Sequence, residues 1–236
     1  MTSHYESLQQ ASAYRDAFKV DPPEVLGERH LWPRKPGFCI RSVAAAVDAA
    51  ADTSTLVPRV RELLPAQWGM VPHWVKSASD GKLRAPKLVV ARSETASTSQ
   101  NFRDAWLNGQ RCIVPLQAFF EDDWRSGKAV PTRISRVDGQ PMAVAGLWAC
   151  WSSPEGEPFF SYALLTVNAN SHALMRRYQP AGNDKHMPVI LGDGVLDAWL
   201  NVRVEKSKEF MRPYPAQALA ANPVESKADK VPKGLF

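Results

Sequence analysis

Short apolar runs separated by turn-forming residues dominate the second half of the chain. Each run is rich in Val, Ile, Phe or Trp, which is the pattern of buried β-strands. Segments such as RSGKAVP and SSPEGEP lie between these runs and indicate loops or hairpins. Together with the apolar stretch after the turn-rich WPRKPG, the pattern predicts strands at residues 38–48, 111–120, 142–149, 159–167 and 187–191.

Apolar residues at spacings of three and four predict helices elsewhere. Residues 7–19 form the clearest such pattern, and the predicted helix ends before the breaker pair Pro22-Pro23. Other helical patterns cover 101–107, 171–178 and 195–204, and a short amphipathic segment covers 56–64. The strands follow one another without regular helical crossovers. We therefore expect an α+β fold with a mainly antiparallel sheet and helices around it.

The composition is that of an ordinary globular protein. The 236 residues, 44% of them hydrophobic and 22% charged, allow one domain with an ample core. The N-terminus MTSHYESLQQ lacks the features of a secretory signal, and no run of eighteen apolar residues occurs. The scattered Cys39, Cys112 and Cys150 are expected to be thiols in a reducing cytoplasm. A single domain over 1–223 and a polar tail over 224–236 are predicted.

The charge balance mildly favours a polyanionic partner. The chain has 29 basic and 24 acidic residues, for a net charge of +5, together with eight tryptophans. Aromatic faces beside cations suit base stacking, although a tryptophan more often fills the core. The histidines and cysteines show no metal-ligand spacing. A Gly-x-Ser-x-Gly elbow and a Gly-rich phosphate loop are also absent from the sequence, so no metal or cofactor is expected.

Five segments in register carry a family resemblance. They are MTSHY at residues 1–5, WGMVPHW at 68–74, ARSET at 91–95 with Phe102-Arg103 after it, RCIVPLQAFFE at 111–121, and the stretch from AGLW at 145–148 through LTVNAN to HMPVIL at 186–191. Together they resemble the SRAP family, the SOS-response-associated peptidases. The resemblance runs from residue 1 to about residue 223.

The resemblance implies a fold and a reaction. The family has a bifurcated, pseudo-barrel sheet with a basic groove for single-stranded DNA. Removal of the initiator Met exposes a cysteine, whose α-amine and thiol condense with the ring-opened aldehyde of an abasic site. The same cysteine cuts a leader peptide in some members, so the implied activities are those of a peptidase (a hydrolase) and an abasic-site lyase. The implied partner is single-stranded or abasic DNA, and a monomer is expected.

Several site residues carry over from the family. Glu121 matches the catalytic glutamate, and Arg92 matches an arginine that contacts DNA phosphate. Trp74 and Pro36 match positions that border the abasic nucleotide and its stacked neighbours. His4 stands at a DNA-binding position, where it either replaces an arginine of other members or matches the Ser-His-Tyr start of one subgroup of the family. Two alternatives remain open from the residues themselves: Glu121 as a structural acid, and Arg92 in a buried salt bridge with Glu94 or Glu121.

Three departures affect the expected chemistry. Thr2 stands where the nucleophilic cysteine belongs, and Val90 replaces an asparagine. The family histidine aligns with Gln179, or with Asp184 in a gapless comparison, while His186 comes two residues later than that. We therefore expect a family member with impaired catalysis, and the alternative is a non-catalytic single-stranded DNA-binding pseudoenzyme. An N-terminal threonine can still act as a nucleophile with its own amine as base.

Overall fold

Five strands close into a barrel at the centre of the molecule. The computed structural model describes residues 2, 4–45, 59–152, 156–180 and 182–224. The barrel strands are β3 (Pro36–Ala44), β4 (Arg59–Trp68), β6 (Arg111–Asp123), β8 (Met142–Ser152) and β9 (Pro158–Asn168). They pair in the order β3–β4–β9–β8–β6, and β6 pairs back with β3. The β4–β9 pair is parallel and the other four pairs are antiparallel, so the barrel is mixed.

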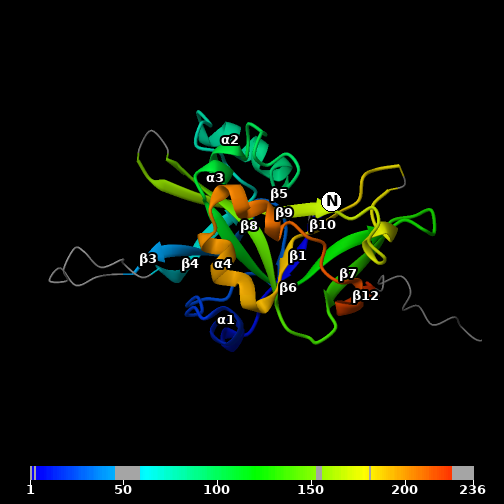
Figure 1. Cartoon of the computed structure of the whole chain (residues 1–236). Coiled ribbons are helices and arrows are strands. Elements are labelled where there is room, and N and C mark those ends of the chain that lie inside the picture. The colour runs from blue at the N-terminus through cyan, green and yellow to red at the C-terminus, as the bar shows by residue number, and fades with distance from the viewer. Residues whose placement is uncertain (1, 3, 46–58, 153–155, 181, 225–236) are drawn as a thin grey trace, which may run out of the picture.

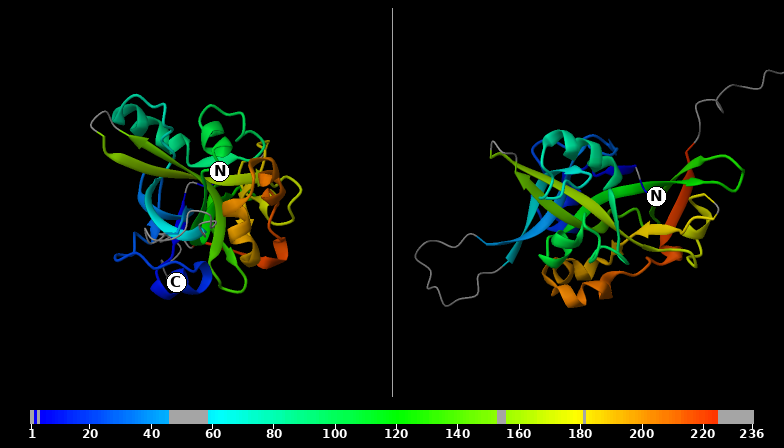
Figure 2. Two further views of the ribbon diagram at one scale, coloured as in Figure 1. Left: turned by 60° about the vertical axis from the view of Figure 1, so that its left-hand side comes forward. Right: turned by 90° about the horizontal axis from the view of Figure 1, so that it is seen from above.

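Seven shorter strands extend this barrel among the described residues. β1 (Tyr5–Ser7) lies between β6 and β2 (His30–Leu31), and β7 (Val130–Arg136) lies between β6 and β12 (Leu219–Pro223). β5 (Val90–Arg92) and β10 (His186–Pro188) pair with β9, and β11 (Ile190–Leu191) pairs with β8. In the view from above, the β3–β4 and β8–β9 arms diverge on one side and β7 extends on the other (Figure 2). The predicted α+β class and mainly antiparallel sheet are confirmed.

Short helices cover the outside of the barrel (Figure 1). α2 (Ala78–Arg84) and α3 (Arg103–Leu107) lie at one end, α1 (Ala11–Phe18) lies at the opposite end, and α4 (Leu196–Asn201) packs against β6 and β3. Short 3-10 turns are η1 (Ala85–Lys87), η2 (Met175–Arg177), η3 (Asp193–Val195), η4 (Val204–Phe210) and η5 (Ala216–Ala218). None of the described helices is long and apolar enough to cross a membrane.

The predicted elements are found with altered bounds. The run 187–191 divides into β10 and β11, because Val189 bonds to both Leu165 and Ala145 between them. The predicted helix at 171–178 is wrong except for the single turn η2, and the one at 7–19 begins only at Ala11. From residue 59 onward the amphipathic segment is the start of β4. Residues 46–48 of the first predicted strand and 225–236 of the predicted tail lie outside the described residues.

The core fills the barrel and the space beneath the helices. Four of the eight tryptophans are buried, namely Trp68, Trp106, Trp151 and Trp199. Trp74 and Trp148 are half-buried, whereas Trp32 and Trp124 are exposed. Cys39 and Cys112 are buried free thiols, and Cys150 is a partly exposed one. The single-domain organisation over residues 1–223 stays a prediction.

Candidate functional site

The N-terminal strand lies along the end of β6 and brings Thr2 to Glu121. Tyr5 pairs with Phe119 in the β1–β6 register, and the Phe120 main-chain N–H donates to the His4 carbonyl oxygen at 3.1 Å. Two residues earlier, the Thr2 hydroxyl donates to a Glu121 carboxyl oxygen at 2.5 Å. Both side chains are buried, at 2% and 5% exposure. Residues that are 119 positions apart in sequence therefore meet through one strand pairing.

Glu6 secures this strand to its neighbours. Its carboxylate is buried and lies 2.6 Å from Arg29 and 2.7 Å from Arg133. Burial alone raises the pKa of Glu6, but the hydrogen bonds from Arg133 and Arg29 outweigh it and leave the pKa below its ordinary value. Charged hydrogen bonds of this kind are among the stronger ones in proteins. Glu6 thus fixes the strand that positions Thr2.

The environment of Glu121 favours its protonated form. Burial, the largest influence, raises the pKa of its carboxyl group, and the nearby charge of Asp122 acts in the same direction. The positive charge of the N-terminal amine and, after it, the hydrogen bond from Thr2 lower the pKa, but not enough to offset burial. A carboxyl group with a raised pKa can exchange protons closer to neutral pH. Glu121 therefore has the properties required of a general acid or base.

A pocket of about 400 Å³ opens beside Glu121. Its walls come from β6, from the β6–β7 loop, from the start of β7 and from three segments distant in sequence. The lining residues are His4, Trp32, Phe120, Glu121, Asp122, Trp124, Pro131, Gln179 and Pro180. One buried carboxyl group among aromatic and polar side chains is a common composition for a ligand site.

Three rings form an aromatic column along this pocket. The His4 imidazole lies between the Trp32 indole and the Phe120 ring, with centroid distances of 4.1 and 4.0 Å and an interplanar angle of 8° on both sides. Burial and, to a lesser degree, the charge of His30 lower the pKa of His4 to about 4. His4 is therefore uncharged at neutral pH, and the column offers stacking rather than a cation.

Gln179 reaches the pocket because the chain turns sharply there. Its backbone is left-handed, with φ of 69°, and its main-chain N–H donates to the Asp122 carbonyl oxygen at 3.0 Å. Its side-chain amide donates to the His186 carbonyl oxygen at 2.9 Å. Asp184 does not line this pocket; it is exposed and accepts a hydrogen bond from Asn170. Gln179 and Asp184 are the two residues with which the family histidine can be aligned, and Gln179 is the one that lines the pocket beside Glu121.

β5 carries two further predicted residues. Val90 pairs with Leu164, and its side chain is buried. Arg92 is exposed and makes no ion pair within the described part of the chain. Glu94 accepts a hydrogen bond from the Asn168 main-chain N–H at 3.0 Å and lies 3.7 Å from the His186 ring. The alternative of a buried salt bridge at Arg92 is therefore wrong.

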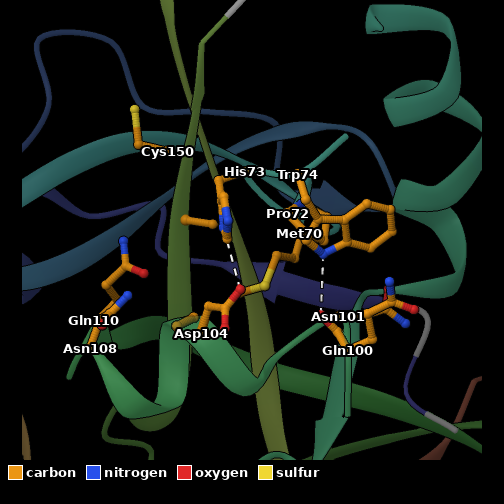
Figure 3. A pocket seen from close by; sticks show the side chains of 12 residues that line it. Met70, Pro72, His73, Trp74, Gln100, Asn101, Asp104, Asn108, Gln110 and Cys150 are labelled. Atoms are coloured by element: carbon orange, nitrogen blue, oxygen red, sulfur yellow. Dashed lines mark hydrogen bonds and ion pairs between the residues drawn. The ribbon is translucent and has the colours of Figure 1, made fainter. Parts of the chain in front are cut away.

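Trp74 and Pro36 lie away from the Glu121 pocket. Trp74 lines a second pocket with His73 and Asp104 (Figure 3). Pro36 begins β3, where it is exposed and pairs with Gln67. The structure brings together Thr2, His4, Glu121 and Gln179. A single groove that also includes Trp74, Pro36, Val90 and Arg92 stays a prediction.

The sequence analysis missed six residues of the Glu121 pocket, among them Pro131 and Pro180. Phe120, Asp122 and Trp124 lie within three positions of Glu121, so proximity to that residue was an available signal. Trp32 offered only its place in a turn-rich segment. Within the described ranges, no three His, Cys, Asp or Glu side chains gather as metal ligands do.

Comparisons with known proteins place the chain in a family. The family model for SOS response associated peptidases (SRAP) matches residues 1–231. The abasic site processing protein HMCES of Gallus gallus is 27% identical over 252 residues, which cover 95% of this chain and 71% of the relative. The abasic site processing protein YoqW of Bacillus subtilis is 33% identical over 166 residues, 68% of each chain. A crystal structure from Bordetella bronchiseptica superposes with a TM-score of 0.82 at 39% identity, covering 95% of this chain and 100% of the other. The chain belongs to the SRAP family.

Proposed function

We propose that this protein recognises abasic sites in single-stranded DNA, and that Thr2 prevents a durable covalent crosslink. The observation that carries the proposal is the buried Thr2–Glu121 hydrogen bond beside an aromatic pocket. Relatives that match most of the chain are named abasic site processing proteins, which supports the same assignment. We expect a monomer that acts in the cytoplasm.

The pocket suits a nucleotide that lacks its base. Its volume of about 400 Å³ accommodates a sugar, and the Glu121 carboxyl group is available for proton exchange with that sugar. Trp32 and Trp124 are 50% and 38% exposed at the pocket, so their rings are accessible to neighbouring bases. Stacking on aromatic side chains is a general, sequence-tolerant way to bind single strands.

Covalent capture by Thr2 is chemically limited. A free α-amine on Thr2, which requires removal of Met1, adds to the aldehyde of the opened sugar, and loss of water leaves an imine. The hydroxyl group then adds across the C=N bond and closes an oxazolidine ring. A thiol closes the more stable thiazolidine, so a threonine adduct reverts more readily. Glu121 supplies the proton for the departing hydroxyl group and recovers it later.

Two other departures favour a weakened reaction. The buried Val90 side chain has no hydrogen-bonding atom with which to orient a sugar. Gln179 replaces a group that titrates near neutral pH, and its side-chain N–H is committed to the His186 carbonyl oxygen. These losses support binding without efficient chemistry, the pseudoenzyme alternative.

The test compares five proteins, namely the wild type, three single variants and their triple combination, with abasic single-stranded DNA on a denaturing gel. We expect no durable band from the wild type and a weak one from Thr2→Cys. The triple variant Thr2→Cys, Val90→Asn, Gln179→His should exceed the sum of its single variants, because groups that act on one intermediate are non-additive. General acid–base groups typically contribute a factor of about 10²–10⁴ in rate.

Two results would overturn the proposal. A denaturation-resistant wild-type band that forms within minutes in near-stoichiometric yield would make Thr2 a working nucleophile. Absence of binding to an oligonucleotide with a non-reactive tetrahydrofuran abasic analogue would remove the DNA assignment altogether. The mass of the N-terminal peptide reports whether the Thr2 amine is free.

A further inference from the structure

The second pocket has a composition unlike that of the first. It encloses about 280 Å³ between the segment after β4, the region around α3 and the end of β8. Figure 3 shows His73 and Trp74 on one side, facing Asp104 and Gln100 on the other, with Asn108 and Gln110 at a third edge. The His73 ring lies 3.6 Å from the Asp104 carboxylate. Side chains from three separate segments thus converge on one small space.

Carboxamide side chains are concentrated around this pocket. Gln100, Asn101, Asn108 and Gln110 all line it, and within the described residues their side-chain amides have no hydrogen-bond partner. Some amides elsewhere in the chain are engaged, since Gln117 donates to the Gly139 carbonyl oxygen and Gln179 donates to the His186 carbonyl oxygen. Each free carboxamide offers a donor and an acceptor side by side. The pocket therefore has unused capacity to bind a group with both.

A rigid aromatic wall and an apolar floor complete the pocket. The Trp74 indole N–H donates to the Gln100 carbonyl oxygen at 3.2 Å, and the Arg84 guanidinium lies 5.0 Å from the ring centroid. Both contacts hold the ring in place. Met70, Ala105 and Ala149 are buried and form the apolar part of the lining. Flat, partly apolar ligands fit such a wall.

The charges around the pocket disfavour an anion. None of its lining residues is a lysine or an arginine, and Asp104 contributes a carboxylate. A phosphate group in the pocket would therefore meet one carboxylate and no lysine or arginine among the lining residues. Paired donors and acceptors beside an aromatic ring instead match the edge and face of an unstacked nucleobase.

We propose that this pocket binds one unstacked base of the DNA strand, at a position separate from the abasic nucleotide. The inference rests on the proposed function for the DNA itself. Gln110 immediately precedes β6 and Glu121 lies near its other end, so the two are eleven residues apart, or about 36 Å along an extended strand. The two pockets therefore hold different nucleotides. The consequence is a base preference at one fixed distance from the abasic site.

The experiment uses the full chain and tetrahydrofuran-containing oligonucleotides in which one base at a time is changed. We expect wild-type affinity to change about fivefold or more at a single position, as one matched amide–base contact provides. The double variant Asn101→Leu, Gln110→Leu should bind DNA with this preference flattened. Gln217→Leu, on the exposed surface of η5, is the matched control and should retain it. Thermal melting verifies that each variant is folded.

A parallel titration separates this inference from the proposed function. Free deoxynucleosides are titrated into the protein, and the side-chain amide signals are recorded by NMR. In the wild type, the signals of Asn101 and Gln110 should shift. Equal affinity for every base at every position, or an unchanged preference in the folded double variant, overturns the base pocket. Amide shifts with nucleosides but no oligonucleotide binding overturn the DNA function and leave a nucleobase site. Failure of both measurements removes both assignments.

Discussion

Replacing Glu121 by glutamine should change how the stability of the protein depends on pH. Burial raises the pKa of the Glu121 carboxyl group in the folded state, whereas an unfolded glutamate titrates near pH 4.3. The folded state therefore holds this proton to a higher pH than the unfolded state does. Its contribution to stability is full below about pH 4.3 and is lost as the pH rises through the folded-state pKa. Glutamine keeps the shape and the acceptor for Thr2 but does not titrate.

Proton linkage sets the size of the effect. One proton that differs between the two states gives a slope of about 1.4 kcal/mol per pH unit between the two pKa values. Over that window, the wild-type free energy of unfolding should fall relative to that of Glu121→Gln by this amount per unit. Outside the window the two curves should run parallel. Thr2→Ala removes a hydrogen bond that lowers the pKa, so it should extend the window upward.

Urea unfolding from pH 4 to pH 8 measures this difference curve directly. Glu24→Gln, which changes an exposed carboxylate elsewhere, is the matched control and should follow the wild-type curve. Parallel wild-type and Glu121→Gln curves over the whole range would refute the reasoning. A wild type that gains stability over the variant with rising pH would show a lowered pKa, and hence a dominant positive charge at the site.

Three further predictions concern binding and folding. Arg92→Ala should weaken binding to single-stranded DNA and reduce the slope of log affinity against log salt concentration by about one. Arg212→Ala, which changes another exposed arginine, is the control and should leave that slope nearly unchanged. An unaltered slope for Arg92→Ala would contradict a phosphate contact. Trp32→Ala should cost about 1–3 kcal/mol in fluorescence-anisotropy binding of the tetrahydrofuran oligonucleotide, and an intact affinity would remove the stacking role. Glu6→Gln should lower the free energy of unfolding by about 2 kcal/mol, because both of its arginine partners lose a charged hydrogen bond; a loss under about 0.5 kcal/mol in urea unfolding argues against that anchor.

The barrel was predictable where burial makes a strand apolar on both faces. β6 is buried along most of its length, and the corresponding run at 111–120 is almost uninterrupted in the sequence. β4 alternates less clearly, because its first half is exposed or half-buried, and its pattern resembled an amphipathic segment. β7 carries several polar residues, and β12 is five residues long with two alanines, an asparagine and a proline, so neither produced a long apolar run.

The sequence predicted individual residues of the site but not how the fold brings them together. Glu121 followed from the resemblance, and the structure shows it buried beside Thr2. The Trp32–His4–Phe120 column depends on two long-range pairings, β1 with β2 and β1 with β6, which no local pattern contains. The choice between Gln179 and Asp184 likewise required the bond from Gln179 to Asp122, which fixes the loop against β6.

The contact between Thr2 and Glu121 shows how recognition and chemistry can separate at one position. Exchanging a thiol for a hydroxyl group preserves a donor at the second residue, so the buried carboxyl group keeps its hydrogen bond. The bond also gives the buried Thr2 hydroxyl group a partner, and a buried polar group without one costs about 1–3 kcal/mol. The stability of the site therefore does not depend on sulfur, whereas a lasting adduct does. A chain with threonine at this position can keep the pocket and its affinity for the abasic nucleotide, and the crosslink yield is the quantity that should respond to the substitution.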